Sequence, residues 1–274
     1  MNLKGKMALI TGAGTGIGAA IARRFVTDGA KVCITGRRHE MLEKVARSLP
    51  TGSTTMSAGD VSNLEDAKQM VMTAVNFGGK LDVLVNNAGI DPPGSIVEAD
   101  PNLWKRVIDV NLTGPFFMMK AAIPQILKSG GGSIINIASL AGIRCIPAMS
   151  AYCSSKAGLI MLTQQAALDY GPSKIRCNVI CPGAVRTEMT EHTMTPLAET
   201  LETDLNEAFA KLTSFSPLRR VATPDEITGL CSFLASDDSK FMTGAVLVID
   251  GGASIVDVNG AALSSTGIKW GGGK

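Results

Sequence analysis

The sequence has few of the residues on which several common catalytic chemistries depend. It contains only two histidines, His39 and His192, and its six cysteines form no Cys-x-x-Cys pair. A histidine-rich metal site and a disulfide framework are therefore not expected, and a Ser-His-Asp hydrolase would have to use one of the two histidines. We expect no bound metal, and we expect the cysteines to be small buried side chains. Acid–base chemistry must then come from another type of residue.

Long hydrophobic runs and an excess of charge of one sign are also missing. No apolar run reaches the roughly 18 residues of a membrane-spanning helix, and the first residues lead into a strand-like segment without the hydrophobic stretch of a signal peptide. The 26 basic and 24 acidic residues give a net charge of +2 and are scattered along the chain. These features predict a cytoplasmic protein with no nucleic-acid or membrane partner.

Short β-branched runs alternate with helix-length amphipathic segments along most of the chain. Seven runs are predicted as strands, at residues 7–10, 31–35, 54–57, 81–85, 133–137, 175–180 and 245–249. Helices between consecutive strands indicate a parallel sheet, because parallel strands need long crossover connections. We therefore predict a single α/β domain over residues 1–274, a Rossmann-type doubly wound seven-stranded parallel sheet with helices on both faces.

Two stretches depart from this alternation. Residues 187–215 contain no strand pattern, and leucines recur there with Phe209 at helical spacing, which predicts an inserted helical cover over the substrate site. Residues 253–274 are rich in glycine and serine and are predicted to form a C-terminal tail. No linker rich in proline, glycine or serine divides the rest of the chain.

A cluster of glycines lies between the first predicted strand and a helix-like segment. The run from Thr11 to Gly18 departs from the generic G-x-G-x-x-G spacing, because the third glycine of that pattern would fall on Ile17. Glycines at this place let the backbone approach a pyrophosphate, and the free amides of the helix start favour its negative charge. The loop predicts a dinucleotide site that includes Gly12, Thr15, Gly16, Ile17 and Gly18.

The end of the second predicted strand bears on which coenzyme binds. An NAD site usually has a carboxylate about 20 residues beyond the glycine loop, whereas a guanidinium binds the 2′-phosphate of NADP. Here Gly36 ends the strand, and Arg37 and Arg38 follow it. The pattern favours NADP(H), with NAD(H) as the second choice. The alternative is that both arginines are solvated residues at a helix start.

One of only two tyrosines lies in the sequence Tyr152-Cys153-Ser154-Ser155-Lys156. On a helix, the i, i+4 spacing places the phenol of Tyr152 and the ammonium of Lys156 on one face. A phenol has an ordinary pKa of about 10 and needs roughly 4 kcal/mol of phenolate stabilisation to act at neutral pH, part of which a neighbouring cation supplies. The pair is a candidate acid–base centre, although such pairs also occur by chance on helix surfaces.

Together these pieces resemble the short-chain dehydrogenase/reductase family, of the 3-oxoacyl reductase-like type, over residues 3–252. The motifs that carry the resemblance occur in the family's order and at its spacing. They are the run from Thr11 to Gly18, Asp60-Val61, Asn86-Asn87-Ala88-Gly89, Asn111, Ser139, Tyr152-x3-Lys156, Pro182-Gly183-x-Val185-x-Thr187 and Asp250-Gly251-Gly252.

The resemblance implies a catalytic set of Asn111, Ser139, Tyr152 and Lys156. Tyr152 would exchange a proton with the substrate oxygen, to which Ser139 would hydrogen-bond. Lys156 would lower the pKa of the tyrosine and bind the nicotinamide ribose, and Asn111 would hold a water of a proton relay. The coenzyme contacts implied besides Tyr152 and Lys156 are Asp60, Val61, Asn87, Ala88, Gly89, Pro182, Gly183, Val185 and Thr187. Asp60 could instead cap a loop.

Apolar residues predominate between Ser139 and Lys156 and in the predicted cover. They indicate a pocket suited to a cyclic or alkyl ketone. Arg144 either anchors a substrate anion or faces solvent. The predicted substrate contacts are Ser139, Arg144, Cys145, Met149, Tyr152 and Met189.

The predicted function is hydride transfer between NADP(H) and a small secondary alcohol or ketone. Two alternatives remain open at this point: an NAD-dependent dehydrogenase of a cyclic or hydroxy-acid alcohol, and a non-catalytic dinucleotide-binding sensor. The resemblance also implies a homotetramer in which helices at residues 102–129 and 151–170 form contacts between subunits. The apolar residues named for this surface are Phe116, Phe117, Met118 and Met119.

Overall fold

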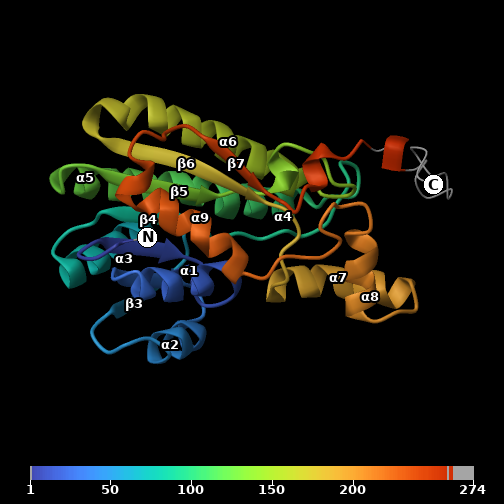
Figure 1. The fold of residues 1–274 in the computed structure, drawn as a ribbon, viewed down its shortest axis with the longest axis horizontal. Coiled ribbons are helices and arrows are strands. Elements are labelled where there is room, and N and C mark those ends of the chain that lie inside the picture. The colour runs from blue at the N-terminus through green and yellow to red at the C-terminus, as the bar shows by residue number, and fades with distance from the viewer. Residues whose placement is uncertain (1, 258, 262–274) are drawn as a thin grey trace, which may run out of the picture.

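Seven parallel strands form one sheet (Figure 1), in the order β3-β2-β1-β4-β5-β6-β7. The computed structural model describes residues 2–257 and 259–261. The strands are β1 (Met7–Thr11), β2 (Lys31–Gly36), β3 (Thr54–Ala58), β4 (Val83–Asn86), β5 (Gly132–Ile137), β6 (Ile175–Pro182) and β7 (Val246–Ile249). The predicted doubly wound sheet is confirmed, and only the strand ends differ from the prediction, most at the start of β4 and the end of β6.

The direction of the chain across the sheet reverses at β1. From β1 the chain moves outward to β2 and β3, and it then returns to β4, which pairs with the other edge of β1. The loops that leave the carboxyl ends of β1 and β4 therefore run in opposite directions and leave a crevice between them. This end of the sheet is where the fold offers a ligand site.

Helices cover both faces of the sheet. One face carries α1 (Gly16–Thr27), α2 (His39–Arg47) and α9 (Asp225–Ala235). The other face carries α3 (Leu64–Gly78), α5 (Gly114–Lys128) and α6 (Ser150–Tyr170).

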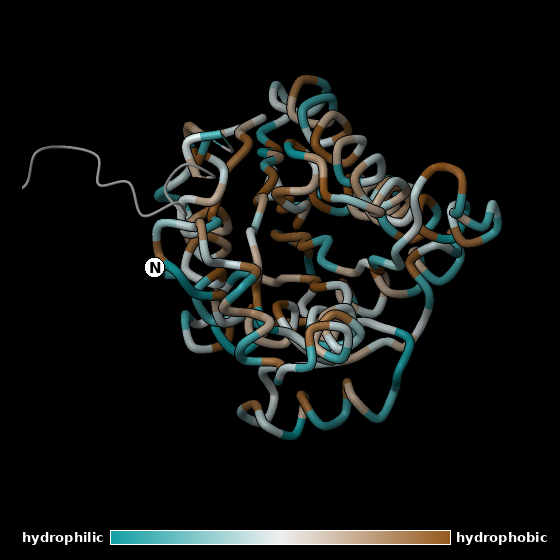
Figure 2. The backbone as a smooth tube through the Cα atoms, turned by 90° about the vertical axis from the view of Figure 1, so that its right-hand side faces the viewer, coloured by the Kyte–Doolittle hydropathy of each residue, from teal (hydrophilic) through white to brown (hydrophobic). Residues whose placement is uncertain are grey.

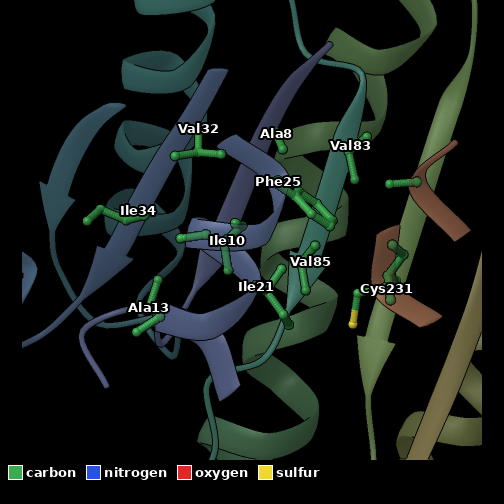
Figure 3. Close-up of a cluster of buried hydrophobic side chains, with 14 of the residues drawn as sticks. Ala8, Ile10, Ala13, Ile21, Phe25, Val32, Ile34, Val83, Val85 and Cys231 are labelled. Carbon is green, nitrogen blue, oxygen red and sulfur yellow. The ribbon is translucent and has the colours of Figure 1, made fainter. Parts of the chain in front are cut away.

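The core on the α1 side shows how the sequence pattern produces these layers. Ile21 and Phe25 of α1 pack with Val83 and Val85 of β4, and Cys231 of α9 joins the same cluster (Figure 3). Hydrophobic stretches of the chain pass through the middle of the molecule, and hydrophilic stretches occur mainly at its periphery (Figure 2). Because both faces of the sheet are covered, the central strands are apolar throughout rather than alternating.

The helix predicted over residues 102–129 forms as one helical run with a π-helical turn in its middle. α4 (Pro101–Ile108) ends at a π-helical turn, Asp109–Thr113, and α5 begins after it. Asn111 lies in this turn and is fully buried. The predicted long helix is thus confirmed, and the π turn inside it was not predicted because it adds a residue to the helix without a signal in the apolar spacing.

The segment predicted as a helical cover forms two helices, α7 (Glu188–Thr200) and α8 (Leu205–Leu212). They lie side by side beyond one end of the sheet (Figure 1). The side chain of Thr187 caps α7, and the side chain of Asp204 caps α8 by accepting a hydrogen bond from the N–H of Glu207. The leucines and Phe209 that recur at helical spacing in residues 187–215 are thus distributed over two separately capped helices.

Only the beginning of the predicted C-terminal tail, residues 253–274, belongs to the described part of the chain. A short 3-10 turn covers Ala253–Ile255. Residues 258 and 262–274 lie outside the described residues.

The cysteines differ in exposure more than expected from the sequence. Cys33, Cys177, Cys181 and Cys231 are buried, whereas Cys145 is exposed. Burial raises the pKa of the Cys33, Cys177 and Cys231 thiols to about 12. The prediction of burial is wrong for Cys145, which lies in the loop between β5 and α6.

The turn between β1 and α1 packs closely against the loop that follows β4. The side-chain amide of Asn87 donates to the carbonyl oxygens of Thr11 and Gly12 at 3.0 and 3.1 Å. A Cβ atom at Gly18, in the first turn of α1, would lie 2.5 Å from Nδ2 of Asn87. A glycine is therefore required here by the close approach of two loops.

We predict that Gly18→Ala destabilises the fold and that Gly229→Ala does not. A methyl group at Gly18 displaces Asn87, and overpacking of this kind costs typically about 1–3 kcal/mol. Gly229, in the middle of α9, has nothing within 4 Å of its Cβ position and no proline beside it, so alanine is tolerated there. Urea unfolding followed by circular dichroism measures both effects. Equal unfolding midpoints for the two variants would contradict the close packing at Gly18.

Candidate active site

A cavity of about 560 Å³ opens at the carboxyl ends of the strands. It reaches from the glycine loop after β1 to Tyr152 and Lys156 on α6. Of the residues predicted to contact the coenzyme, all but Gly18 line this cavity, namely Gly12, Thr15, Gly16, Ile17, Arg37, Arg38, Asp60, Val61, Asn87, Ala88, Gly89, Tyr152, Lys156, Pro182, Gly183, Val185 and Thr187. The structure thus brings together segments that are far apart in the sequence.

The start of α1 suits a pyrophosphate. Thr15, at the N-cap position, makes no capping hydrogen bond with its side chain, and the first turn contains no acidic residue. The N–H groups of this turn are available to an anion, which the helix dipole also favours. A dinucleotide coenzyme therefore fits the residues present at this end of the cavity.

Asp60, predicted to lie at the adenine, is held by three hydrogen bonds from the protein. Arg106 donates to it at 2.6 Å, and the hydroxyl and N–H of Ser62 donate at 2.7 and 2.9 Å. Burial opposes its ionisation, but these donors hold the pKa of Asp60 below its ordinary value. The bond from the N–H of Ser62 is the loop-capping contact that the sequence also allowed.

The two arginines after β2 have different surroundings. Arg38 forms two hydrogen bonds of 3.0 Å with the carboxylate of Glu188, the first residue of α7, and one of 3.4 Å with the hydroxyl of Thr15. Arg37 is exposed at the mouth of the cavity. Because the side chains of Arg38 and Glu188 are 51% and 60% exposed, water screens this ion pair and it contributes little to stability.

Tyr152 and Lys156 occupy consecutive turns at the start of α6. The Nζ atom of Lys156 lies 5.6 Å from the centre of the Tyr152 ring and donates a hydrogen bond to the carbonyl oxygen of Ile137, at the end of β5, at 2.9 Å. Ser139 follows this strand, and its hydroxyl accepts a hydrogen bond from the N–H of Ala141 at 3.1 Å. The end of β5 and the start of α6 thus bring the three predicted side chains into one cavity.

Burial sets the protonation of this pair. It raises the pKa of Tyr152 to about 12, against a smaller downward effect of the hydrogen bond with Ser139. It also lowers the pKa of Lys156 to about 8. Removal from water favours the neutral form of each group. Lys156 alone therefore does not make the phenol acidic.

Asn111 uses its side chain to hold the loop that follows β4. Its Oδ1 accepts from the N–H of Ile90 at 2.9 Å, and its Nδ2 donates to the carbonyl of Ile90 at 2.8 Å. Nδ2 also donates to the hydroxyl of Ser155, on α6, at 3.1 Å. Asn111 thereby ties the loop after β4 to the helix that carries Tyr152.

The predicted substrate contacts are brought together only in part. Met189 lines the cavity with Ser139 and Tyr152, but Arg144, Cys145 and Met149 do not. Arg144 is exposed and donates to the carbonyl oxygen of the preceding residue at 3.0 Å. The sequence allowed Arg144 either to anchor a substrate anion or to face solvent. In the structure its side chain faces solvent.

Asp91 follows Ile90 beside the site and was not identified from the sequence, although it is not among the residues that line the cavity. It is half-buried, and the hydroxyl of Thr193 on α7 donates to it at 3.3 Å. Its charge acts on both Tyr152 and Lys156. An acidic residue directly after Asn87-Ala88-Gly89-Ile90, at the carboxyl end of β4, was the signal that could have identified it.

The part of the chain that the structure describes contains neither a candidate membrane span nor a candidate metal site. No helix there is long and apolar enough to cross a membrane. The same residues contain no group of three or more His, Cys, Asp and Glu side chains that could hold a metal ion.

Comparison with known proteins shows similarity along nearly the whole chain. Residues 12–254 match the family model described as enoyl-(acyl carrier protein) reductase. The chain is 42% identical over 255 residues to trans-4-hydroxycyclohexanecarboxylate dehydrogenase of Sinomonas cyclohexanicum, covering 90% of this chain and 92% of that protein. It is 37% identical over 257 residues to meso-2,3-butanediol dehydrogenase of Serratia marcescens, covering 94% and 98%.

A solved structure extends this similarity to three dimensions. A short-chain type dehydrogenase/reductase from Mycobacterium marinum matches with a TM-score of 0.85 and 35% sequence identity, covering 93% of this chain and 98% of the other. With the family model and both curated relatives in agreement, the chain belongs to the short-chain dehydrogenase/reductase family.

Proposed function

We propose that the protein transfers hydride between NADP(H) and a small secondary alcohol or ketone, as a carbonyl reductase or 3-oxoacyl reductase-like enzyme. Its family includes NAD(P)-dependent dehydrogenases that act on CH–OH groups. The observation that carries the proposal is the one cavity that joins the uncapped start of α1 to Ser139, Tyr152 and Lys156. A dinucleotide and a small substrate would meet in this space.

In this proposal the substrate oxygen lies between the hydroxyls of Ser139 and Tyr152. The coenzyme, when bound, supplies the hydride donor for ketone reduction and the acceptor for alcohol oxidation. Ser139 donates a hydrogen bond to the substrate oxygen, and Tyr152 exchanges the proton at its phenol oxygen. Lys156 has three N–H donors, of which one bonds to Ile137, so it can also bind the nicotinamide ribose.

We propose that Asn111 supports a proton relay. Its side-chain amide already bonds to Ile90 and Ser155. A relay water held by Asn111 would therefore bind to the backbone of the π-helical turn. The presence of Ser139, Tyr152 and Lys156 in one cavity argues against the alternative of a non-catalytic sensor, which would not need the two hydroxyls beside the lysine.

NADP(H) is the proposed coenzyme because Arg37 and Arg38 lie at the mouth of the cavity, beyond the end of β2. A 2′-phosphate would bind between guanidinium groups there. One observation favours the alternative of an NAD-dependent dehydrogenase. Arg38 already forms an ion pair with Glu188, which competes with the binding of a 2′-phosphate to this arginine. The exposure of this ion pair makes it replaceable by a phosphate, so we keep NADP(H) as the proposal.

We further propose that α7 and α8 form the substrate cover of a single catalytic unit. Met189 and His192 of α7 line the cavity next to the catalytic pair. Their position in the cavity supports a role of this helix in covering the substrate. Movement of the cover would admit the substrate and then exclude water.

A homotetramer built on α5 and α6 is also proposed. Phe116 on α5 and Met161 and Leu168 on α6 are exposed apolar side chains, which favours their burial against another subunit. The expectation of exposure is wrong for Met118 and Met119. Both are buried because they pack in the core between α5 and the sheet.

The catalytic proposal predicts that Tyr152→Phe abolishes most activity. Loss of the proton donor should lower kcat by about 10²–10⁴-fold. The matched control is Tyr170→Phe, which removes the other tyrosine of the chain and should leave kcat unchanged. A panel of secondary alcohols and ketones, assayed by coenzyme absorbance with NADPH and NADH, provides the measurement. Wild-type rates in Tyr152→Phe would exclude the phenol from catalysis.

The coenzyme proposal predicts that Arg37→Ala lowers the preference for NADPH over NADH. Loss of one charged hydrogen bond to a phosphate is worth about 1.5–3 kcal/mol, or roughly 10–100-fold in the ratio of kcat/KM values. Arg23→Ala, at an exposed position of α1, is the matched control and should leave the ratio unchanged. An unchanged ratio in Arg37→Ala would remove the assignment of Arg37 to the 2′-phosphate.

A further inference from the structure

Arg106 of α4 lines the cavity, but the proposed mechanism gives it no role. We propose that Arg106 is a positioning residue for the coenzyme, which orients the carboxylate of Asp60 toward the amino group of the adenine base. The site would then select adenine over a base that has a carbonyl oxygen in place of the amino group. This inference rests on the proposed function, because Asp60 is predicted to lie at the adenine, and it assigns a base preference to that end of the cavity.

Arg106, Ser62 and Asp60 form a closed ring of side-chain hydrogen bonds. Nη2 of Arg106 donates to Oδ2 of Asp60 at 2.6 Å, and Nη1 donates to the hydroxyl of Ser62 at 2.7 Å. The same hydroxyl donates to Oδ1 of Asp60 at 2.7 Å. The planar guanidinium thus joins α4 to the loop after β3 by binding two oxygens of that loop at once.

Arg106 determines how the carboxylate of Asp60 is turned about its Cβ–Cγ bond. Both hydrogen bonds from Ser62, one from its hydroxyl and one from its N–H, end on Oδ1. Among the described residues, Arg106 is the one donor to Oδ2. Without Arg106 the carboxylate would be held at one oxygen and free to rotate. The position of Oδ2 therefore depends on Arg106.

One acceptor position of Asp60 remains for a ligand. A carboxylate offers about four such positions, and the hydrogen bonds from the protein use two at Oδ1 and one at Oδ2. Asp60 and Arg106 both line the cavity, so the remaining position at Oδ2 lies where a coenzyme would bind. The amino group of adenine is a donor and fits this position, whereas a carbonyl oxygen there would be repelled by the carboxylate.

Arg106 also supplies positive charge to Asp60. Burial is the largest effect on the pKa of Asp60 and raises it, but the hydrogen bonds from Arg106 and Ser62 and the charge of Arg106 bring it below its ordinary value. The side chains of Arg106 and Asp60 are 35% and 29% exposed, against 51% and 60% for Arg38 and Glu188. Water therefore screens this ion pair less than the pair at the mouth of the cavity.

The backbone around Asp60 is anchored independently of Arg106. The N–H of Asp60 donates to the carboxylate of Asp66, on α3, at 2.7 Å. Val61 packs against the start of α5, where a Cβ atom at Gly114 would lie 2.8 Å from its side chain. Loss of Arg106 should therefore release the carboxylate of Asp60 without displacing the loop.

The test compares the binding of NADPH with that of its analogue in which hypoxanthine replaces adenine, so that a carbonyl oxygen replaces the amino group. Fluorescence of the nicotinamide ring measures both Kd values without turnover. The wild-type protein should bind NADPH about 10–100-fold more tightly than the analogue, as expected for one hydrogen bond to a charged group. Arg106→Ala should lower this preference by about tenfold or more, because the carboxylate is then free to rotate. Asp60→Ala removes the acceptor and gives the value for complete loss.

The double variant Asp60→Ala/Arg106→Ala separates positioning from direct contact. If Arg106 acts through Asp60, the double variant has the same preference as Asp60→Ala. Lys105→Ala changes the adjacent, exposed cation of α4 and should leave the preference at the wild-type value. Ser62→Ala removes the bridging hydroxyl but keeps the ion pair, so it should lower the preference less than Arg106→Ala does.

Other outcomes overturn the inference. An equal rise of both Kd values in Arg106→Ala would show a structural role only. An unchanged preference in Arg106→Ala, or in Ser62→Ala where Arg106→Ala does not fold, would show that the ring does not orient Asp60. A further loss of preference in the double variant would place Arg106 in direct contact with the base. Failure of the wild-type protein to bind NADPH or NADH would overturn the proposed function and this inference with it, whereas binding of NADPH without a preference over the analogue would overturn the inference alone.

Discussion

The burial of a tyrosine and a lysine side by side is the constraint on which the rest of the site depends. Removal from water raises the pKa of Tyr152 to about 12 and lowers that of Lys156 to about 8, which shifts each group toward its neutral form. A phenol in this state keeps its proton at neutral pH. A further positive charge is needed before the proton can move, and the nicotinamide ring of an oxidised coenzyme carries one. In the proposed mechanism, coenzyme binding therefore precedes proton transfer.

The fold supplies this arrangement by fixing several loops at one end of the sheet. The reversal of strand order at β1 leaves the crevice at this end of the sheet. The side-chain amide of Asn87, in the loop after β4, hydrogen-bonds to the turn before α1. The π-helical turn between α4 and α5 buries Asn111, whose amide ties that same loop to α6. Asn111 is buried and Asn87 is half-buried, and the hydrogen bonds of both amides hold these loops in place. The proposed cover, α7 and α8, is joined to this frame through exposed contacts such as that of Arg38 with Glu188, as expected of a part that moves.

The sequence predicts those parts of the site whose geometry is local. The glycine loop lies within one strand-turn-helix unit, and Tyr152 and Lys156 lie one helical turn apart, so short spacing locates them. Arg144 and Cys145 were assigned to the substrate from their nearness to Ser139 in the sequence, but the chain after the 3-10 turn Leu140–Gly142 runs to the surface. The contact of Asp91 with Thr193 joins residues 102 positions apart, which no periodicity reveals. The direction of the Tyr152 pKa shift likewise depends on burial in three dimensions rather than on the neighbouring lysine.

The most direct test of this account is the titration of Tyr152 by tyrosinate absorbance in the Tyr170→Phe variant, where it is the only tyrosine left. In the protein without coenzyme, the phenolate should form with a pKa of about 12. Binding of the oxidised coenzyme should lower that pKa by about 1–3 units, the usual effect of an added neighbouring positive charge. A phenolate already present near neutral pH without coenzyme, or a pKa that coenzyme binding leaves unchanged, would contradict the account.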